Sequence, residues 1–128
     1  MTLYAETSAV LRWLFGEKGG EAVRARLAAA SKVASSRLAL IEKRRVVRRA
    51  EHEGRITAAQ SADLLAVFAQ AASTWAVLEV SEEVARRAEE GFPNEPVRTL
   101  DSIHLASALF LRQSFPDLEI VSADERVI

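Results

Sequence analysis

The chain has 128 residues, of which 49% are hydrophobic and 27% are charged, so it is long enough to bury the core of a single domain, residues 1–128. Seventeen Lys and Arg residues against eighteen Asp and Glu residues leave a formal net charge of −1, which excludes binding of a polyanion through net charge alone. The lack of cysteine excludes disulfides and thiolate metal sites, and no stretch approaches the roughly 20 apolar residues of a membrane span, so we expect a cytoplasmic protein with no membrane association.

Strand and helix signals alternate along the chain. In chain order, short apolar or β-branched runs predict strands at 3–5, 32–35, 75–80 and 118–121. Capping residues and apolar residues at helical spacing predict helices at about 8–15, 21–30 and 37–53, and others that begin near 57, 82 and 99. Thr7 or Ser8 is expected to cap the first of these. Ser35 or Ser36 is expected to cap the third, and Thr57 to begin the fourth. Because parallel strands need helical crossovers, this order predicts an α/β fold: a small parallel sheet of about four strands covered by helices on both faces, in three layers.

Acidic residues follow two of the predicted strands. Glu6 comes directly after the first strand, and Asp124 follows the last one through Ser122-Ala123. In an open parallel sheet, ligands bind outside the carboxyl ends of the strands, so these two acids are expected at the same edge. Each taken alone is also explained as an ordinary loop or helix-start acid.

Two further acids lie on predicted helices. Glu42 shares part of its helical stripe with apolar residues, which indicates partial burial, although a surface pair with Arg45 is an open alternative. Asp101 stands in the first turn of its helix, near the same sheet edge, where the helix dipole favours an acid in any case. His104, one turn further on, is interpreted as a hydrogen-bonded structural histidine, with metal ligation or general-base catalysis as the alternative.

Four carboxylates in one cleft would repel each other, and a hard divalent cation would remove that repulsion. Oxygen-only ligands favour Mg²⁺ or Mn²⁺ over zinc or copper. Such an ion can polarise a phosphodiester and lower the pKa of a bound water. The pattern therefore predicts a metal-dependent hydrolase that acts on nucleic acid.

A basic run follows Glu42 on the same predicted helix: Lys43, Arg44, Arg45, Arg48 and Arg49. It could lie along a phosphate backbone, and the residues selected as RNA contacts are Lys43, Arg44 and Arg48. The alternative is a solvated helix face whose cations pair with nearby glutamates.

Four segments in this order resemble the PIN domain: Tyr4-Ala5-Glu6-Thr7-Ser8, Ser36-Arg37-Leu38 through Glu42, Arg98-Thr99-Leu100-Asp101 through Ala108, and Ile120-Val121-Ser122-Ala123-Asp124. More closely, the chain looks like a VapC-type toxin of a toxin–antitoxin pair. The resemblance implies a PIN-like three-layer sandwich and a Mg²⁺- or Mn²⁺-dependent endoribonuclease. It also implies an antitoxin that inhibits the enzyme and a homodimer. By position, the metal-binding and catalytic acids would be Glu6, Glu42, Asp101 and Asp124, supported by hydroxyls of Ser8 and Ser122.

Two features depart from the family's pattern. Glu6 stands where the family usually has aspartate, and the chain stops at Ile128, where the family continues through another helix and a short edge strand. The first alternative is therefore a catalytically weak or inactive PIN-fold module that binds an antitoxin or RNA. The second is an unrelated doubly wound domain that binds a nucleotide or phosphate, which the lack of a glycine-rich phosphate loop disfavours.

Overall fold

The structure is a computed structural model that describes residues 1–121, so the predicted site residues Ser122 and Asp124 lie outside the described residues. Four parallel strands form one sheet in the order β3-β2-β1-β4. The strands are β1 (Thr2–Ala5), β2 (Lys32–Ser36), β3 (Ala76–Leu78) and β4 (Glu119–Val121). The predicted α/β fold with a small parallel sheet is therefore confirmed.

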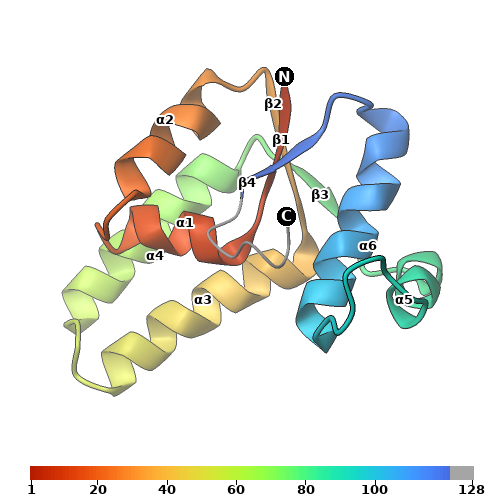
Figure 1. Cartoon of the computed structure of the whole chain (residues 1–128). Helices are drawn as coiled ribbons and strands as arrows, with labels where there is room; N and C mark the ends of the chain where they lie inside the picture. Colours follow the sequence, from red (N-terminus) through yellow and green to blue (C-terminus); the bar gives the residue numbers. More distant parts are fainter. Residues whose placement is uncertain (122–128) are drawn as a thin grey trace.

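Six helices cover the two faces of this sheet in the described part of the chain (Figure 1). On one side lie α1 (Thr7–Leu14), α2 (Gly20–Ala29) and α4 (Ala58–Ala72), with α3 (Arg37–His52) packed against α1 and α4. On the other side lie α5 (Glu82–Glu89) and α6 (Thr99–Ser114). Within residues 1–121, no helix combines the length and apolar character needed to cross a membrane.

The alternation of side chains along the two central strands builds a separate core on each face. Ala5 and Val33 point toward α1, α3 and α4, where they pack with Phe68 and other apolar residues. Tyr4 and Ala34 point to the opposite face and pack against α6. Successive side chains of a strand point to opposite faces of the sheet, and on β1 and β2 both sets are covered by helices. The two central strands are therefore almost wholly buried, as is usual in a parallel sheet.

The strand predicted at 75–80 is only three residues long in the structure. β3 is an edge strand that pairs with β2 alone, in the register of Ala34–Ala76 to Ser36–Leu78. β2 ends at Ser36 because the Ser36 hydroxyl accepts a hydrogen bond from Ala39 N at 3.1 Å and caps α3. Residues beyond Leu78 therefore have no strand beside them to pair with.

Candidate active site

Three of the four predicted acids line one pocket. Glu6, Glu42 and Asp101 come from the start of α1, the second turn of α3 and the first turn of α6. The pocket has a volume of about 430 Å³, and its lining is completed by Arg98, Thr99, Leu100 and His104. It lies at the carboxyl edge of the sheet, where β1 and β2 pass into α1 and α3. Acids far apart in the sequence thus meet in space; their chemical roles stay a prediction.

Both the side chain and the backbone N–H of Glu6 are held by hydrogen bonds. Its side chain caps α1, where Glu6 Oε2 accepts hydrogen bonds from Ser8 N at 3.1 Å and from the Ser8 hydroxyl. Its backbone N donates to Val121 O at 3.2 Å, at the end of β4. The prediction of Thr7 or Ser8 as the helix cap was wrong, because the cap is Glu6, whose carboxylate accepts the hydrogen bond from Ser8 N.

Glu42 is half-buried and accepts two hydrogen bonds on one oxygen. Thr7 Oγ1 donates to Glu42 Oε1 at 2.7 Å, and His104 Nε2 lies 2.6 Å from the same atom. Burial alone would raise the pKa of Glu42, but the hydrogen bonds from His104 and Thr7 outweigh it and hold the pKa below its usual value. Among the described residues Glu42 pairs with His104 and forms no ion pair with Arg45, so the alternative of a surface pair with Arg45 is not observed. Its Oε2 takes no part in either hydrogen bond.

His104 connects Glu42 to the core of the sheet. Its ring is 2% exposed, and its Nδ1 lies 3.0 Å from the Tyr4 hydroxyl. A ring with its proton on Nε2 satisfies both neighbours, since the Tyr4 hydroxyl donates to Nδ1 and Nε2–H donates to Glu42. Burial raises the pKa of Tyr4, so this hydroxyl stays a donor. The interpretation of His104 as a hydrogen-bonded residue agrees with the structure, and its partner is the predicted site acid.

Replacing His104 with phenylalanine tests this chain of contacts. The variant keeps a ring of similar size but leaves the Tyr4 hydroxyl and Glu42 Oε1 each without one partner, so the free energy of unfolding is expected to fall by about 2–4 kcal/mol. Urea unfolding would measure the loss. Adding Tyr4→Phe to His104→Phe should cost less than the sum of the two single changes, because it removes the orphaned hydroxyl; strict additivity would contradict the hydrogen-bonded chain.

Lys43 is not an RNA contact, and its prediction as one was wrong. Its side chain is 0% exposed, and its ammonium lies 5.5 Å and 5.6 Å from the ring centroids of Phe68 and Trp75. It donates to Ala5 O at 3.4 Å, directly before Glu6. Burial lowers its pKa to about 8, an effect that the carboxylates of Glu6 and Glu42 oppose. Lys43 thus supplies a positive charge from behind the acids.

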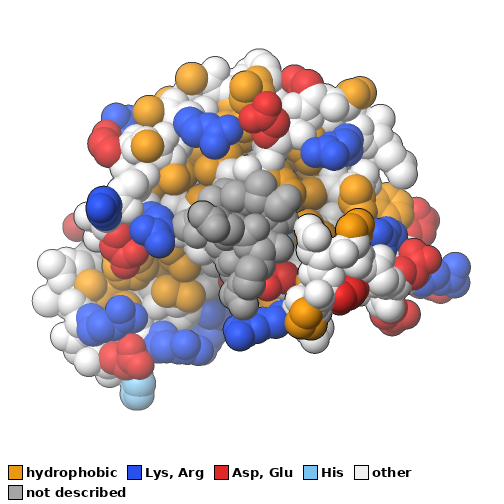
Figure 2. All heavy atoms as spheres, viewed as in Figure 1, with side chains coloured by type: hydrophobic (Ala, Val, Ile, Leu, Met, Phe, Trp, Pro, Cys, Tyr) orange, Lys and Arg blue, Asp and Glu red, His pale blue; other side chains and the backbone are white. Residues whose placement is uncertain are grey.

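The rest of the basic run is exposed on α3: Arg44, Arg45, Arg48 and Arg49. Figure 2 shows Lys and Arg side chains gathered over this helix. Within residues 1–121 none of these arginines forms an ion pair with an acid, whereas other surface arginines of the protein do. The alternative of cations neutralised by neighbouring glutamates therefore does not describe this helix.

The chemistry of the donors fits a hard divalent cation. Glu6, Glu42 and Asp101 offer only oxygen atoms, which suits Mg²⁺ or Mn²⁺. In the part of the chain that the structure describes, no three acidic or histidine side chains already stand close enough to share one ion. The described acids therefore provide the ligand type, and an ion would have to draw them closer or use further ligands.

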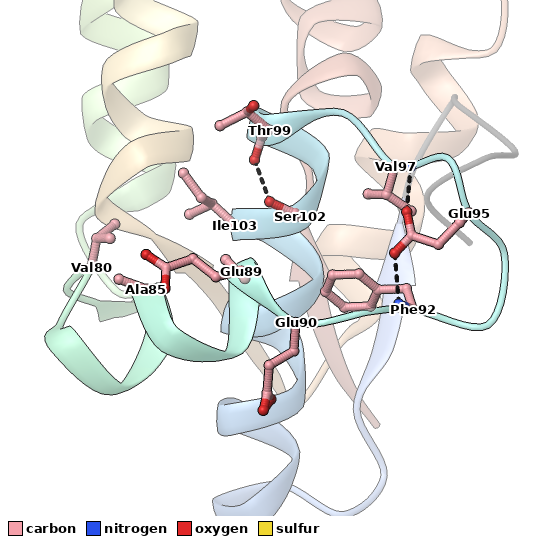
Figure 3. Close-up of a pocket in the computed structure, with 11 residues that line it drawn as sticks. Val80, Ala85, Glu89, Glu90, Phe92, Glu95, Val97, Thr99, Ser102 and Ile103 are labelled. Atoms are coloured by element: carbon pink, nitrogen blue, oxygen red, sulfur yellow. Dashed lines mark hydrogen bonds between the residues drawn. The ribbon is translucent and has the colours of Figure 1, made fainter.

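A second pocket, of about 420 Å³, lies between α5, the segment that follows it and α6 (Figure 3). Glu95 organises this segment, since its Oε2 accepts from Phe92 N at 2.7 Å and its Oε1 from Val97 N at 2.9 Å. None of the predicted site residues lines this pocket, and its Glu95 carboxylate is already engaged by backbone N–H groups. It shares only Thr99 with the acidic pocket.

Sequence reasoning missed several residues around the acids. Thr7 and Tyr4 were assigned to a cap and a strand, and Arg98 was quoted only as part of a motif. Arg98 lies at the start of α6 and lines the acidic pocket. A signal was present for Thr7, since residues next to a strand-end acid share its edge of the sheet. No pattern in the sequence indicated that Tyr4 reaches a helix about 100 residues away.

Comparisons with known proteins agree with this architecture. The structure is similar to a chain of a toxin–antitoxin complex from Klebsiella pneumoniae, with a TM-score of 0.66 and 19% sequence identity, over 97% of this chain and 87% of that one. No curated protein sequence matches. The family model described as the PIN domain matches residues 3–127. The chain therefore belongs to the PIN domain family, whose members are generally nucleases that use divalent metal ions.

Proposed function

We propose that this protein is a Mg²⁺- or Mn²⁺-dependent endoribonuclease that acts as the toxin of a toxin–antitoxin pair, of the VapC type. The observation that carries the proposal is the meeting of Glu6, Glu42 and Asp101 in one pocket at the carboxyl edge of the sheet. Membership of the PIN family supports nuclease chemistry. The likeness to a toxin–antitoxin complex supports the toxin role and an antitoxin partner. Asp124 and Ser122, outside the described residues, complete the proposed site.

The residues of the pocket have distinct tasks in this proposal. Glu6, Glu42 and Asp101, with Asp124, would hold the metal, which when bound supplies positive charge to the scissile phosphodiester. Ser8 fixes the Glu6 carboxylate through two hydrogen bonds. Thr7 and His104 fix one oxygen of Glu42 and leave the other available. Arg98, on the wall of the same pocket, is placed to contact a substrate phosphate.

Cleavage assays test the proposal directly. The purified protein would be mixed with labelled structured RNA and manganese, with and without a chelator. We expect internal cleavage that the chelator abolishes and that manganese in excess restores. RNA that stays intact at every manganese concentration would contradict the proposal, and so would cleavage that survives the chelator.

Glu6→Asp is expected to keep or raise the cleavage rate, because aspartate restores the shorter ligand that the PIN family usually has at this position. The side chain of aspartate can also cap α1, so the fold should be unchanged. Single-turnover cleavage at several manganese concentrations would separate metal affinity from the chemical step. A large loss of rate at saturating manganese would instead mean that the rest of the site is adapted to glutamate.

A second candidate is a PIN-fold module that binds RNA or an antitoxin without cutting RNA. Two observations favour it: glutamate in place of the usual aspartate, and the lack of a ready-made cluster of three metal-binding side chains among residues 1–121. RNA binding without chelator-sensitive cleavage would identify this case. A homodimer, which the family resemblance also implies, is tested by measuring the mass of the protein in solution.

A further inference from the structure

The exposed arginines of α3 are distributed around the helix axis. An α-helix turns by about 100° per residue, so the side chain of Arg49 points within about 20° of Glu42, and that of Arg45 within about 60°. Arg44 points about 160° away from Glu42 and Arg48 about 120° away. Two pairs, each one turn apart, therefore lie on different flanks of the same helix.

Contacts in the structure show which neighbouring element each flank of α3 faces. Arg44 lies over the Phe68 ring, with its guanidinium carbon 5.8 Å from the ring centroid, so the flank of Arg44 faces α4. Glu42 faces the acidic pocket, and the buried stripe of α3 runs through Lys43 and Val47. The flank of Arg45 and Arg49 is thus the one that continues from the pocket.

The arginines of this flank have no acidic ion-pair partner among the described residues. Both Arg45 and Arg49 are exposed, and within residues 1–121 neither forms an ion pair. With a rise of 1.5 Å per residue, Arg45 stands about 4.5 Å and Arg49 about 10.5 Å along the helix axis from Glu42. Two unpaired guanidinium groups in a row, starting beside a pocket of acids, suit a chain of phosphates rather than a single anion.

We propose that Arg45 and Arg49 form a phosphate-binding track that holds the RNA strand beside the scissile bond as it leaves the acidic pocket along α3. The inference rests on the proposed nuclease function and names the residues that position its substrate. It replaces the earlier selection of Lys43, Arg44 and Arg48, since Lys43 is buried and the other two lie off the pocket's flank. Arg45 and Arg49 are positioning residues, because they contact phosphates away from the reacting one.

The test compares two double variants with the same loss of charge: Arg45→Gln with Arg49→Gln, and Arg44→Gln with Arg48→Gln. Binding of a labelled single-stranded RNA would be measured in the presence of a chelator, so that no cleavage occurs, over a series of salt concentrations. Each lost phosphate contact lowers the slope of log affinity against log salt by about 0.7. We expect the first double variant to lower the slope by about 1.4 and the affinity by roughly tenfold, and the second to change both by less than half as much.

Equal effects of the two double variants, or a larger effect of Arg44→Gln with Arg48→Gln, would overturn the track. An unchanged RNA affinity of the first double variant together with weaker binding of polyglutamate would also overturn it and would assign the flank to an acidic protein partner.

A different result would contradict the proposed nuclease function. If the unmodified protein cuts RNA but the first double variant binds RNA normally, only the track is wrong. If the first double variant lowers the slope of log affinity against log salt as expected but the unmodified protein shows no chelator-sensitive cleavage, the proposed nuclease function is wrong.

Discussion

Asp101→Asn is expected to lower manganese-dependent RNA cleavage at least about 100-fold, because a metal ligand or catalytic acid contributes several kcal/mol of transition-state stabilisation. Asparagine has nearly the same shape but carries no charge. Asp101 lies in the first turn of α6 and lines the pocket with the other acids. The loss should therefore come from chemistry and metal binding, with the fold unchanged.

The control for Asp101→Asn is Asp63→Asn, which makes the same chemical change on the exposed surface of α4. Single-turnover cleavage of one RNA and circular dichroism melting curves would be recorded for both variants. The control should cut RNA at the unmodified rate, and both should melt close to the unmodified protein. Cleavage by Asp101→Asn at the unmodified rate would remove Asp101 from the site.

Lys43→Ala is expected to destabilise the protein by about 3 kcal/mol, the usual cost of truncating a long buried side chain. Three contributions add in the same direction and outweigh the desolvation cost of the buried ammonium, which the substitution relieves. A cavity opens beside the Phe68 and Trp75 rings, Ala5 O loses a donor, and the acids of the pocket lose the positive charge behind them. The melting temperature should fall by roughly 10 °C for a chain of this length.

Arg44→Ala is the matched control for Lys43→Ala, because it removes one positive charge from the next residue of the same helix. Arg44 is exposed and its truncation removes a contact with the Phe68 ring, so the melting temperature should fall by only about 2–3 °C, much less than for Lys43→Ala. Chemical unfolding of both variants would measure the difference. If Lys43→Ala unfolds at the same denaturant concentration as Arg44→Ala, the buried ammonium does not stabilise the pocket.

The order and type of the elements could be predicted from the sequence because each depends on local patterns. Ser36 and Thr57 were recognised as possible helix starts, and both side chains accept the capping hydrogen bond in the structure. The strand at 75–80 was predicted too long because its length is set by β2, a neighbour that local propensity does not describe. The length of β3, which depends on a distant partner, was therefore missed, as was the cap of α1, which a glutamate supplies.

The acidic pocket could be predicted because parallel strands bring their carboxyl ends to one edge. That rule placed Glu6 and Asp101 near each other without any knowledge of side-chain contacts. The basic run could not be interpreted in the same way. Neighbouring positions on a helix point in directions about 100° apart, so Lys43 enters the core while Arg44 and Arg45 stay outside. A block of like charges in sequence is therefore not one surface in space.

The central place of β1 in the sheet has a consequence during protein synthesis. β1 is made before the other three strands of the sheet, yet one of its two neighbours is β4, and the backbone N–H of Glu6 is hydrogen-bonded to Val121 O. At roughly 5–20 residues per second, a ribosome needs roughly 6–23 s to reach Val121 after Glu6 has been added. During that interval Glu6 lacks its backbone hydrogen bond to Val121, so a growing chain cannot yet assemble the site that is proposed to cut RNA.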